Sequence, residues 1–459
     1  MALPLRFQTV IARASADTVT NSFDDLHANF GGGSFLSSSN YLSNSPVDTI
    51  ETQANIVPIK RRKLLGKYSC EYIASSALLH NLDGWNYFGY GVNCILKGDN
   101  HTSRHLLYYS ELRGVMSILA SFGIGVFNNR HIIVDSKRKM KYVNAPTPIT
   151  NDRSNKSGTH QFTWEAIDHL FGDAKVQMKF LKRISVDSIS FYDWLDAFSI
   201  NDSHKLSIAT VLLKRLTIDL NTFANDRDAR NEVSYRPYGF MNKFGIAGID
   251  VLKQVHEIWA FSEPIGNDGE FKLDFYLLRE LLQSSFKHVH PHEKSFKNAI
   301  LQYRRRLNTM LNALPLGNER KSELLELFCK QETDFYDTLG ITDFSDIKFT
   351  RAMLYRSLLV SRFSSLFCNQ ILKDSPSVDK SNLEFWWKGV GQELGLWPAA
   401  AIPADFADLW QDFALATEKM QELIQTNPGI SIYELIEKPS DFGFHLCSSS
   451  KIALWGTGL

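Results

Sequence analysis

The sequence predicts a mainly α-helical protein made of helical bundles with one small β-hairpin. Two observations carry this prediction. Apolar residues recur at spacings of three and four through most of the chain, as on the buried face of a helix. The β-branched runs that strands favour gather in one place, between Gly123 and Tyr142.

Bulk composition limits the class of protein. The chain has 459 residues, of which 44% are hydrophobic and 22% charged, as in ordinary globular proteins of two or three domains. Lysine plus arginine equals aspartate plus glutamate at 50 each, which argues against a large non-specific nucleic-acid surface but leaves a local basic site open. Five scattered cysteines predict reduced thiols and a cytoplasmic location. No apolar run reaches 18 residues, so we expect no membrane helix.

The first part of the chain divides into a polar segment and a helical region. Residues 1–55 are rich in Gly, Ser and Asn and are expected to be partly flexible, and residues 56–240 form the first helical region. A basic run that contains Arg61 and Arg62 precedes a helix over Tyr68–Leu82, and a second helix follows over Asp83–Leu96. This basic run is either a solvated helix start or a site for an anionic partner such as RNA.

A strong helical period covers His101–Ser121, and strand character follows. The hairpin between Gly123 and Tyr142 has Asn128 and Asn129 at its expected turn. A second basic cluster lies near the exposed end of this hairpin: Lys137, Arg138 and Lys139. Either it is a solvated turn, or it is an RNA-contacting ribbon.

Helical periods fill most of the remaining chain, with a second helical region over residues 241–459. The last apolar stretch, around Ile452 and Trp455, is expected to be buried and could end as a docked strand. The other expected helices are Thr163–Leu170, Ala174–Arg183, Ser190–Ala197, Gly248–Phe261, Leu273–Phe286, Glu293–Leu314, Glu319–Gln331, Arg351–Leu372 and Ala404–Thr426.

The central helix, Ser203–Ala224, leads into the densest charge in the middle of the chain. Asn201 and its neighbours lie where an N-cap is expected, and Pro237 must stop any continuing helix. The charged residues between Asp226 and Glu232 therefore fall on its last turns or just after them. In one interpretation they form only local ion pairs on a solvated helix end.

A second interpretation comes from a family resemblance. Arg230, Asn231 and the residues through Tyr235 resemble the RNxxxH motif of HEPN domains, and the likeness extends over Tyr68–Gly239. The resemblance implies a dimerising helical bundle that acts on RNA without a metal, in bacterial stress response or antiviral defence. Arg230 would bind phosphate and Asn231 would orient it. Tyr235 stands where the family has histidine, and because tyrosine titrates near pH 10 it is a poor base at pH 7.

Two functions therefore stay open. One is a HEPN-like protein that binds or cleaves RNA, with Arg230, Asn231 and Tyr235 as site residues and Arg61, Arg62, Lys137, Arg138, Lys139 and Arg236 as further nucleic-acid contacts. The other is a non-catalytic scaffold or regulatory subunit that forms a homo-oligomer or joins partner proteins. The sequence has no P-loop, dinucleotide-binding, zinc-protease or esterase motif, and we expect no cofactor and no metal.

Overall fold

The fold is described from a computed structural model of the chain. It describes residues 3–30, 59–126, 131–143, 158–215, 220–235, 248–265, 269–289, 296–330, 348–375, 391–392, 394–398, 400–401, 403, 408–437, 445–446 and 448–458. Side chains at some helix ends within these ranges are also left out of the description.

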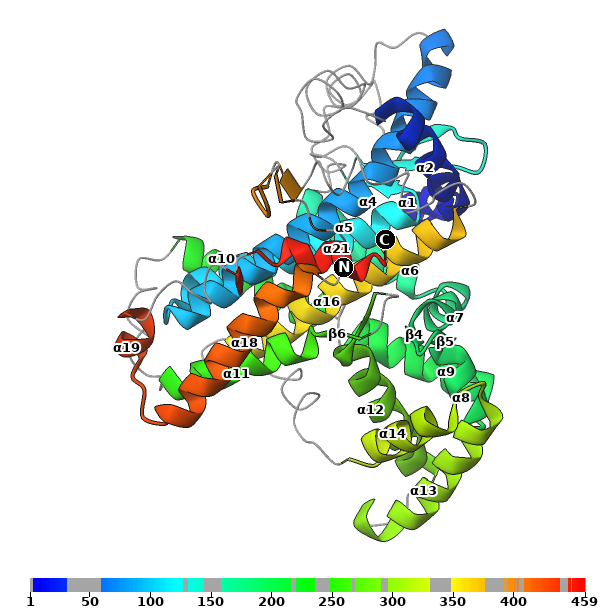
Figure 1. Cartoon of the computed structure of the whole chain (residues 1–459). Helices are drawn as coiled ribbons and strands as arrows, with labels where there is room; N and C mark the ends of the chain where they lie inside the picture. Colours follow the sequence, from blue (N-terminus) through cyan, green and yellow to red (C-terminus); the bar gives the residue numbers. More distant parts are fainter. Residues whose placement is uncertain are drawn as a thin grey trace.

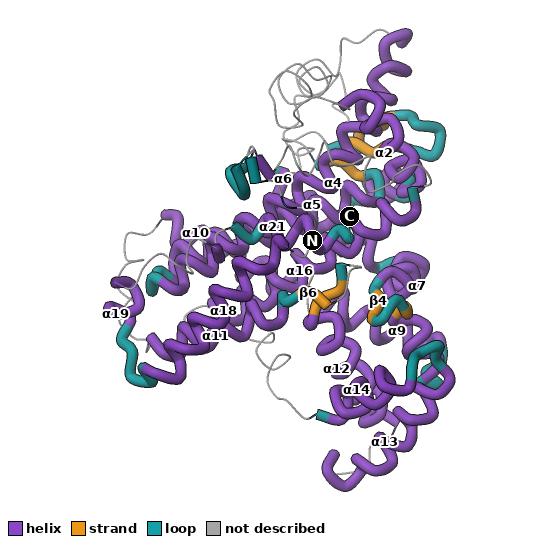
Figure 2. Tube along the Cα trace, viewed as in Figure 1, coloured by secondary structure: helices purple, strands orange, loops and turns teal. Residues whose placement is uncertain are grey.

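Helices dominate the described part of the chain, which confirms the mainly α class (Figure 2). The first nine are α1 Leu5–Ile11, α2 Ala16–Phe30, α4 Ile59–Leu96, α5 Asn100–Ser121, α6 Thr159–Phe171, α7 Ala174–Arg183, α8 Phe191–Ala197, α9 Asp202–Thr210 and the π-helical turn η2 Val211–Arg215. The others are α10 Leu220–Tyr235, α11 Gly248–Phe261, α12 Lys272–Val289, α13 Phe296–Ala313, α14 Asn318–Cys329, α16 Lys348–Asp374, α18 Asp408–Thr426, α19 Ile432–Glu437 and α21 Ser450–Gly456.

Three long helices, α4, α5 and α16, lie side by side through the middle of the molecule (Figure 1). Small residues let them approach closely: a Cβ on Gly84 would lie 3.3 Å from the backbone nitrogen of Gly114. Buried hydroxyls satisfy backbone groups across the interfaces, since Ser117 Oγ donates to the Ala77 carbonyl at 2.6 Å. Because α16 belongs to the second predicted region, these contacts cross residue 240, and the division into two helical regions stays a prediction.

The strands are short and antiparallel, and there are more of them than the sequence suggested. Strands β1 Ile124–Gly125, β2 Ile132–Val134 and β3 Met140–Tyr142 form one sheet in that order. The predicted hairpin therefore gains a third strand, and the expected turn at Asn128 and Asn129 lies outside the described residues. Two further pairs were not predicted: β4 Ser185–Val186 with β5 Ile189–Ser190, and β6 Pro264–Ile265 with β7 Glu270–Phe271.

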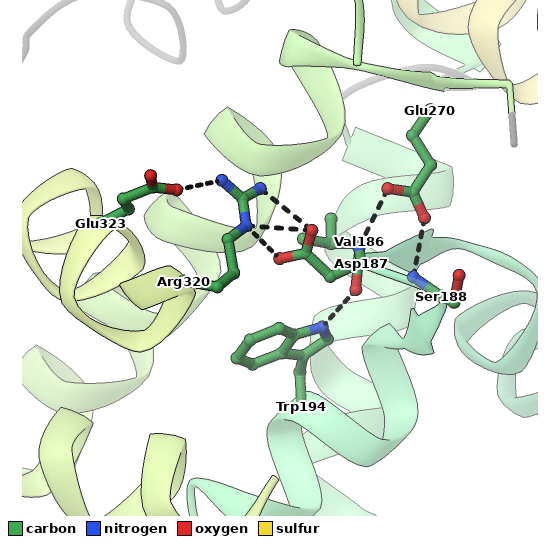
Figure 3. Close-up of polar contacts among 7 residues, drawn as sticks. All are labelled: Val186, Asp187, Ser188, Trp194, Glu270, Arg320 and Glu323. Atoms are coloured by element: carbon green, nitrogen blue, oxygen red, sulfur yellow. Dashed lines mark hydrogen bonds and ion pairs between the residues drawn. The ribbon is translucent and has the colours of Figure 1, made fainter. Parts of the chain in front are cut away.

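The β4–β5 turn ties two distant helices to the body of the protein (Figure 3). Asp187 and Ser188 take positive φ values of 52° and 60°, as a two-residue hairpin turn of type I′ requires. Their backbone N–H groups donate to the carboxylate of Glu270, just before α12, at 2.9 and 3.0 Å. The Asp187 carboxylate in turn accepts from Arg320 of α14 at 3.0 Å. This one turn thus joins β7, which leads into α12, to α14.

Two expectations were wrong, one on a helix boundary and one on the type of the last element. Tyr68–Leu82 and Asp83–Leu96 are one continuous helix, because Gly84 faces α5 at a close crossing and causes no break. The C-terminal stretch is a helix, α21, and not a strand, although it is buried as expected. It packs against α4 and α16. The Ser449 hydroxyl before it donates to the Trp85 carbonyl of α4, and a Cβ on Gly456 would lie 2.9 Å from the Ser365 Cβ of α16. The N-cap at Asn201 is confirmed, since its side chain accepts from the His204 backbone.

Candidate nucleic-acid interface

Helix α10 carries the charged run and packs on α5 and α6. Asp226, Ala229 and Arg230 recur at spacings of three and four and form its inward face, whereas Arg227 and Asp228 are exposed. The residues of the predicted helix Ser203–Ala224 fall in α9, the π-helical turn η2 and α10, with residues 216–219 outside the description. Helix α10 continues beyond Ala224 to Tyr235, two residues before Pro237, where the sequence predicted that a continuing helix must stop. The local sequence therefore turns one arginine of the run toward the protein and leaves the other in solvent.

The Arg230 guanidinium lies over two tyrosine rings of α5. Its central carbon is 5.4 Å from the ring centre of Tyr108 and 5.5 Å from that of Tyr109. One terminal nitrogen donates to Tyr109 Oη at 3.2 Å, and the other donates to Asn231 Oδ1 at 2.9 Å. Among the described residues no carboxylate pairs with Arg230, and its buried Nε has no hydrogen-bond acceptor. Within the described part of the chain its hydrogen-bond partners are neutral, and no carboxylate there neutralises its positive charge.

Tyr235 does not join this arrangement. Its side chain is 79% exposed, and five residues of helix place it about 140° around the axis from Arg230. No described hydrogen bond or ring contact links the two residues. Within one chain the structure thus brings Asn231 to Arg230, whereas Tyr235 points away from Arg230. The role of Tyr235 in the site stays a prediction.

Two histidines that the sequence reasoning had not connected with Arg230 lie beside it. His105 of α5 is 5.0 Å from the Tyr109 ring, and its Nδ1 is 3.1 Å from Ser234 Oγ. His160 of α6 stacks on Tyr108, and its Nδ1 lies 2.7 Å from Tyr108 Oη. They come from other helices and are far from Arg230 in sequence, so only the tertiary fold could show them.

The electrostatics keep both imidazoles neutral near pH 7. Burial lowers the pKa of His160, and the charges of Arg230, Arg113 and Arg227 lower that pKa further. Burial and the charge of Arg230 likewise lower the pKa of His105. The first turn of α6 adds a positive helix end without a side-chain cap at Gly158. The site therefore combines uncompensated positive potential with neutral groups able to accept a proton, which suits an oxyanion such as a phosphate.

The other predicted contact residues lie elsewhere. Lys137, Arg138 and Lys139 are exposed on the turn between β2 and β3, where Arg138 donates to Ser22 at 3.5 Å. This sheet follows the C-terminal end of α5, and about 18 Å of helix separates Tyr109 from Ser121. Helix α4 contains Arg61 and Arg62 in its first turns and runs antiparallel to α5, so it begins near the sheet formed by β1, β2 and β3. The side chains of Arg61 and Arg62 are outside the description. Arg236 lies outside the described residues.

Neither a metal centre nor a membrane helix is found in the described ranges. There, no three His, Cys, Asp or Glu side chains gather closely enough to hold an ion. No described helix is both long and apolar enough to cross a bilayer. The four described cysteines, Cys70, Cys94, Cys329 and Cys368, are not in disulfides.

Comparison with known proteins gave no relative for this chain. No protein-family model, no curated protein and no solved structure matched it.

Proposed function

We propose that the protein binds RNA at the site formed by Arg230, His105, His160, Tyr108 and Tyr109, which we call the Arg230 site. One observation carries the proposal: a half-buried guanidinium, with no carboxylate partner among the residues that the structure describes, lies among tyrosines and neutral histidines. A guanidinium is suited to bind a phosphate oxygen through two parallel hydrogen bonds, and Arg230 would gain a charged partner when RNA arrives. The resemblance to HEPN domains agrees with this ligand.

Cleavage of the bound RNA is part of the same proposal. With Nδ1–H donating to Tyr108 Oη, the His160 Nε2 has the lone pair that would accept the proton of a ribose 2′-hydroxyl. The 2′-oxygen then bonds to phosphorus, the bond to the 5′-oxygen breaks, and that oxygen takes a proton from a donor such as water. The products are a 2′,3′-cyclic phosphate and a 5′-hydroxyl, and no metal is needed. We further propose a cytoplasmic role in bacterial stress response or defence, as the resemblance implies.

The test compares two arginines on the same helix. RNA binding is measured by fluorescence anisotropy for the wild type, Arg230→Gln and Arg227→Gln, and cleavage is followed on gels in EDTA. Arg227 is exposed and already pairs with Asp228 at 3.3 Å, so it controls for general loss of positive charge. We expect Arg230→Gln to weaken binding at least tenfold and Arg227→Gln to change it less than twofold. Equal binding by wild type and Arg230→Gln would contradict the proposal.

Two observations favour the scaffold function. The chain has no net charge, and Tyr235 projects from the end of α10 into solvent, as a protein-docking residue would. In the same assay this function predicts no RNA binding by any variant. It also predicts that Tyr235→Ala, and not Arg230→Gln, weakens self-association measured by mass photometry.

A further inference from the structure

Aromatic side chains continue from the Arg230 site along the outer surface of α4 and α5. The Tyr109 ring beneath the guanidinium is 5.5 Å from the ring of Tyr87 on α4 and 5.0 Å from His105. Tyr90 follows Tyr87 by three residues on α4, so the two side chains share one face of that helix. Two rings, Tyr87 and Tyr90, thus extend the site. Together with Tyr109 and His105 they form what we call the aromatic strip.

The position of Tyr90 follows from the way α4 and α5 pair. A Cβ on Gly91 would lie 2.9 Å from the Leu107 side chain, so this part of α4 lies beside the first half of α5. His105 belongs to the same half of α5. Tyr90 therefore lies near the end of the strip at which α10 packs.

Exposure separates the aromatic strip from ordinary core packing. Trp85 and Phe88, on the opposite face of α4, are fully buried. Tyr90 is 49% exposed, and Tyr87, Tyr109 and His105 are half-buried. No described hydrogen bond uses the hydroxyl of Tyr87 or Tyr90. Tyr87 and Tyr90 are thus partly exposed, and no described hydrogen bond requires a tyrosine at either position.

We propose that the aromatic strip stacks the bases of single-stranded RNA whose phosphate is bound by Arg230; this inference rests on the proposed function. Aromatic side chains bind unpaired bases by stacking, whereas the bases of a duplex are already stacked on one another. The zero net charge of the chain agrees, because stacking needs no broad basic surface. Because Arg230 is the phosphate contact that this proposal invokes, we expect the affinity to depend weakly on salt.

The experiment uses the full chain and three RNA probes. They are a labelled single strand of about 12 nucleotides, within the range of known single-strand sites, the same strand in a blunt duplex, and the same strand with abasic positions at its centre. Tyr87→Leu and Tyr90→Leu remove a ring, and Tyr87→Phe and Tyr90→Phe keep it. We expect each leucine variant to lose roughly tenfold in affinity for the single strand and each phenylalanine variant to lose less than twofold.

The abasic probe and the duplex decide between stacking and other causes. The leucine variants and the wild type bind the abasic strand equally if stacking is the cause, and the duplex binds the wild type more weakly than the single strand does. Equal losses on all three probes, or no loss on the single strand, would overturn the stacking inference. If Arg230→Gln still weakens binding in that case, the proposed function stands without it; if Arg230→Gln binds as the wild type does, the proposed function itself fails. A DNA strand of the same sequence shows whether the 2′-hydroxyl contributes.

Discussion

Arg356 of α16 donates a hydrogen bond to the Asp226 carboxylate of α10 at 2.5 Å, and the two side chains are 3% and 2% exposed. This buried ion pair joins the helix that carries Arg230 to the central helices. Asp226 lies four residues before Arg230 on the same face of α10. The position of the Arg230 guanidinium therefore depends on an ion pair one helical turn away.

Removing one partner of this pair should be costly. We expect Arg356→Met to lower the free energy of unfolding by about 3–5 kcal/mol, because it leaves a carboxylate buried without a cation. Urea denaturation followed by circular dichroism measures the change. The matched control is Arg227→Met, which breaks the exposed pair with Asp228 on the same helix and should cost less than about 1 kcal/mol. Similar losses in both variants would show that Arg356 does not anchor α10.

Glu111 gives the same region a pH dependence. Its carboxyl is buried with Asp226, and Arg356 Nε lies 3.9 Å away, so two acids share one guanidinium. Burial and the charge of Asp226 raise the pKa of Glu111 well above its ordinary value. Between the unfolded and the folded pKa, the folded protein holds a proton that the unfolded chain has lost. Stability from this group therefore falls as pH rises above about 4.5, by about 1.4 kcal/mol per pH unit.

Glu111→Gln tests this dependence because it keeps the shape of the protonated acid. We expect the free energy of unfolding of the variant, minus that of the wild type, to increase as pH rises from about 4.5. The histidines with lowered pKa values make stability rise with pH, which is the opposite trend. Their contribution is the same in both proteins, so it cancels in the difference. A difference that stays constant with pH would mean that Glu111 is ionised in the folded protein.

Sequence periodicity predicted most helices because their buried faces follow a local rule, and α11, for example, has the predicted bounds. It failed where long-range packing decides the outcome. The two helices expected over Tyr68–Leu82 and Asp83–Leu96 are one helix, in which Gly84 faces a close crossing with α5. The apolar C-terminus, for which a strand was considered, is a helix packed against α4. The site shows the same division. The contact between Arg230 and Asn231 is local and could be predicted, whereas His105 and His160 come from other helices and carry no local signal.

Close packing of α5 against α16 gives a third prediction. A Cβ on Gly114 would lie 2.7 Å from Val360 Cγ1, which is shorter than a normal contact. We expect Gly114→Ala to lower the free energy of unfolding by about 1–3 kcal/mol through overpacking. Adding Val360→Ala removes the opposing methyl groups, so the double variant should lose less than the sum of the two single variants. Additive losses in this cycle would place the cost of Gly114→Ala elsewhere.

The two ends of α8 predict changes of opposite sign. Ser199 follows the C-cap with φ 62°, its N–H donates to the Asp196 carbonyl at 2.8 Å, and the next N–H, from Ile200, donates to Leu195 at 2.9 Å. This is a Schellman ending, in which glycine is preferred at the left-handed position, and Ser199 is exposed. We expect Ser199→Gly to raise the free energy of unfolding by about 1 kcal/mol because it removes the strain of a left-handed serine.

Ser190, at the other end of α8, provides the contrasting variant. Its hydroxyl accepts from the Asp193 backbone N–H at 3.1 Å and caps the helix. Ser190→Ala should therefore lower the free energy of unfolding by about 1 kcal/mol. Thermal denaturation of both single variants measures the two effects on one helix. A loss of stability in Ser199→Gly would mean that the flexibility gained by the unfolded chain outweighs the strain removed at this position.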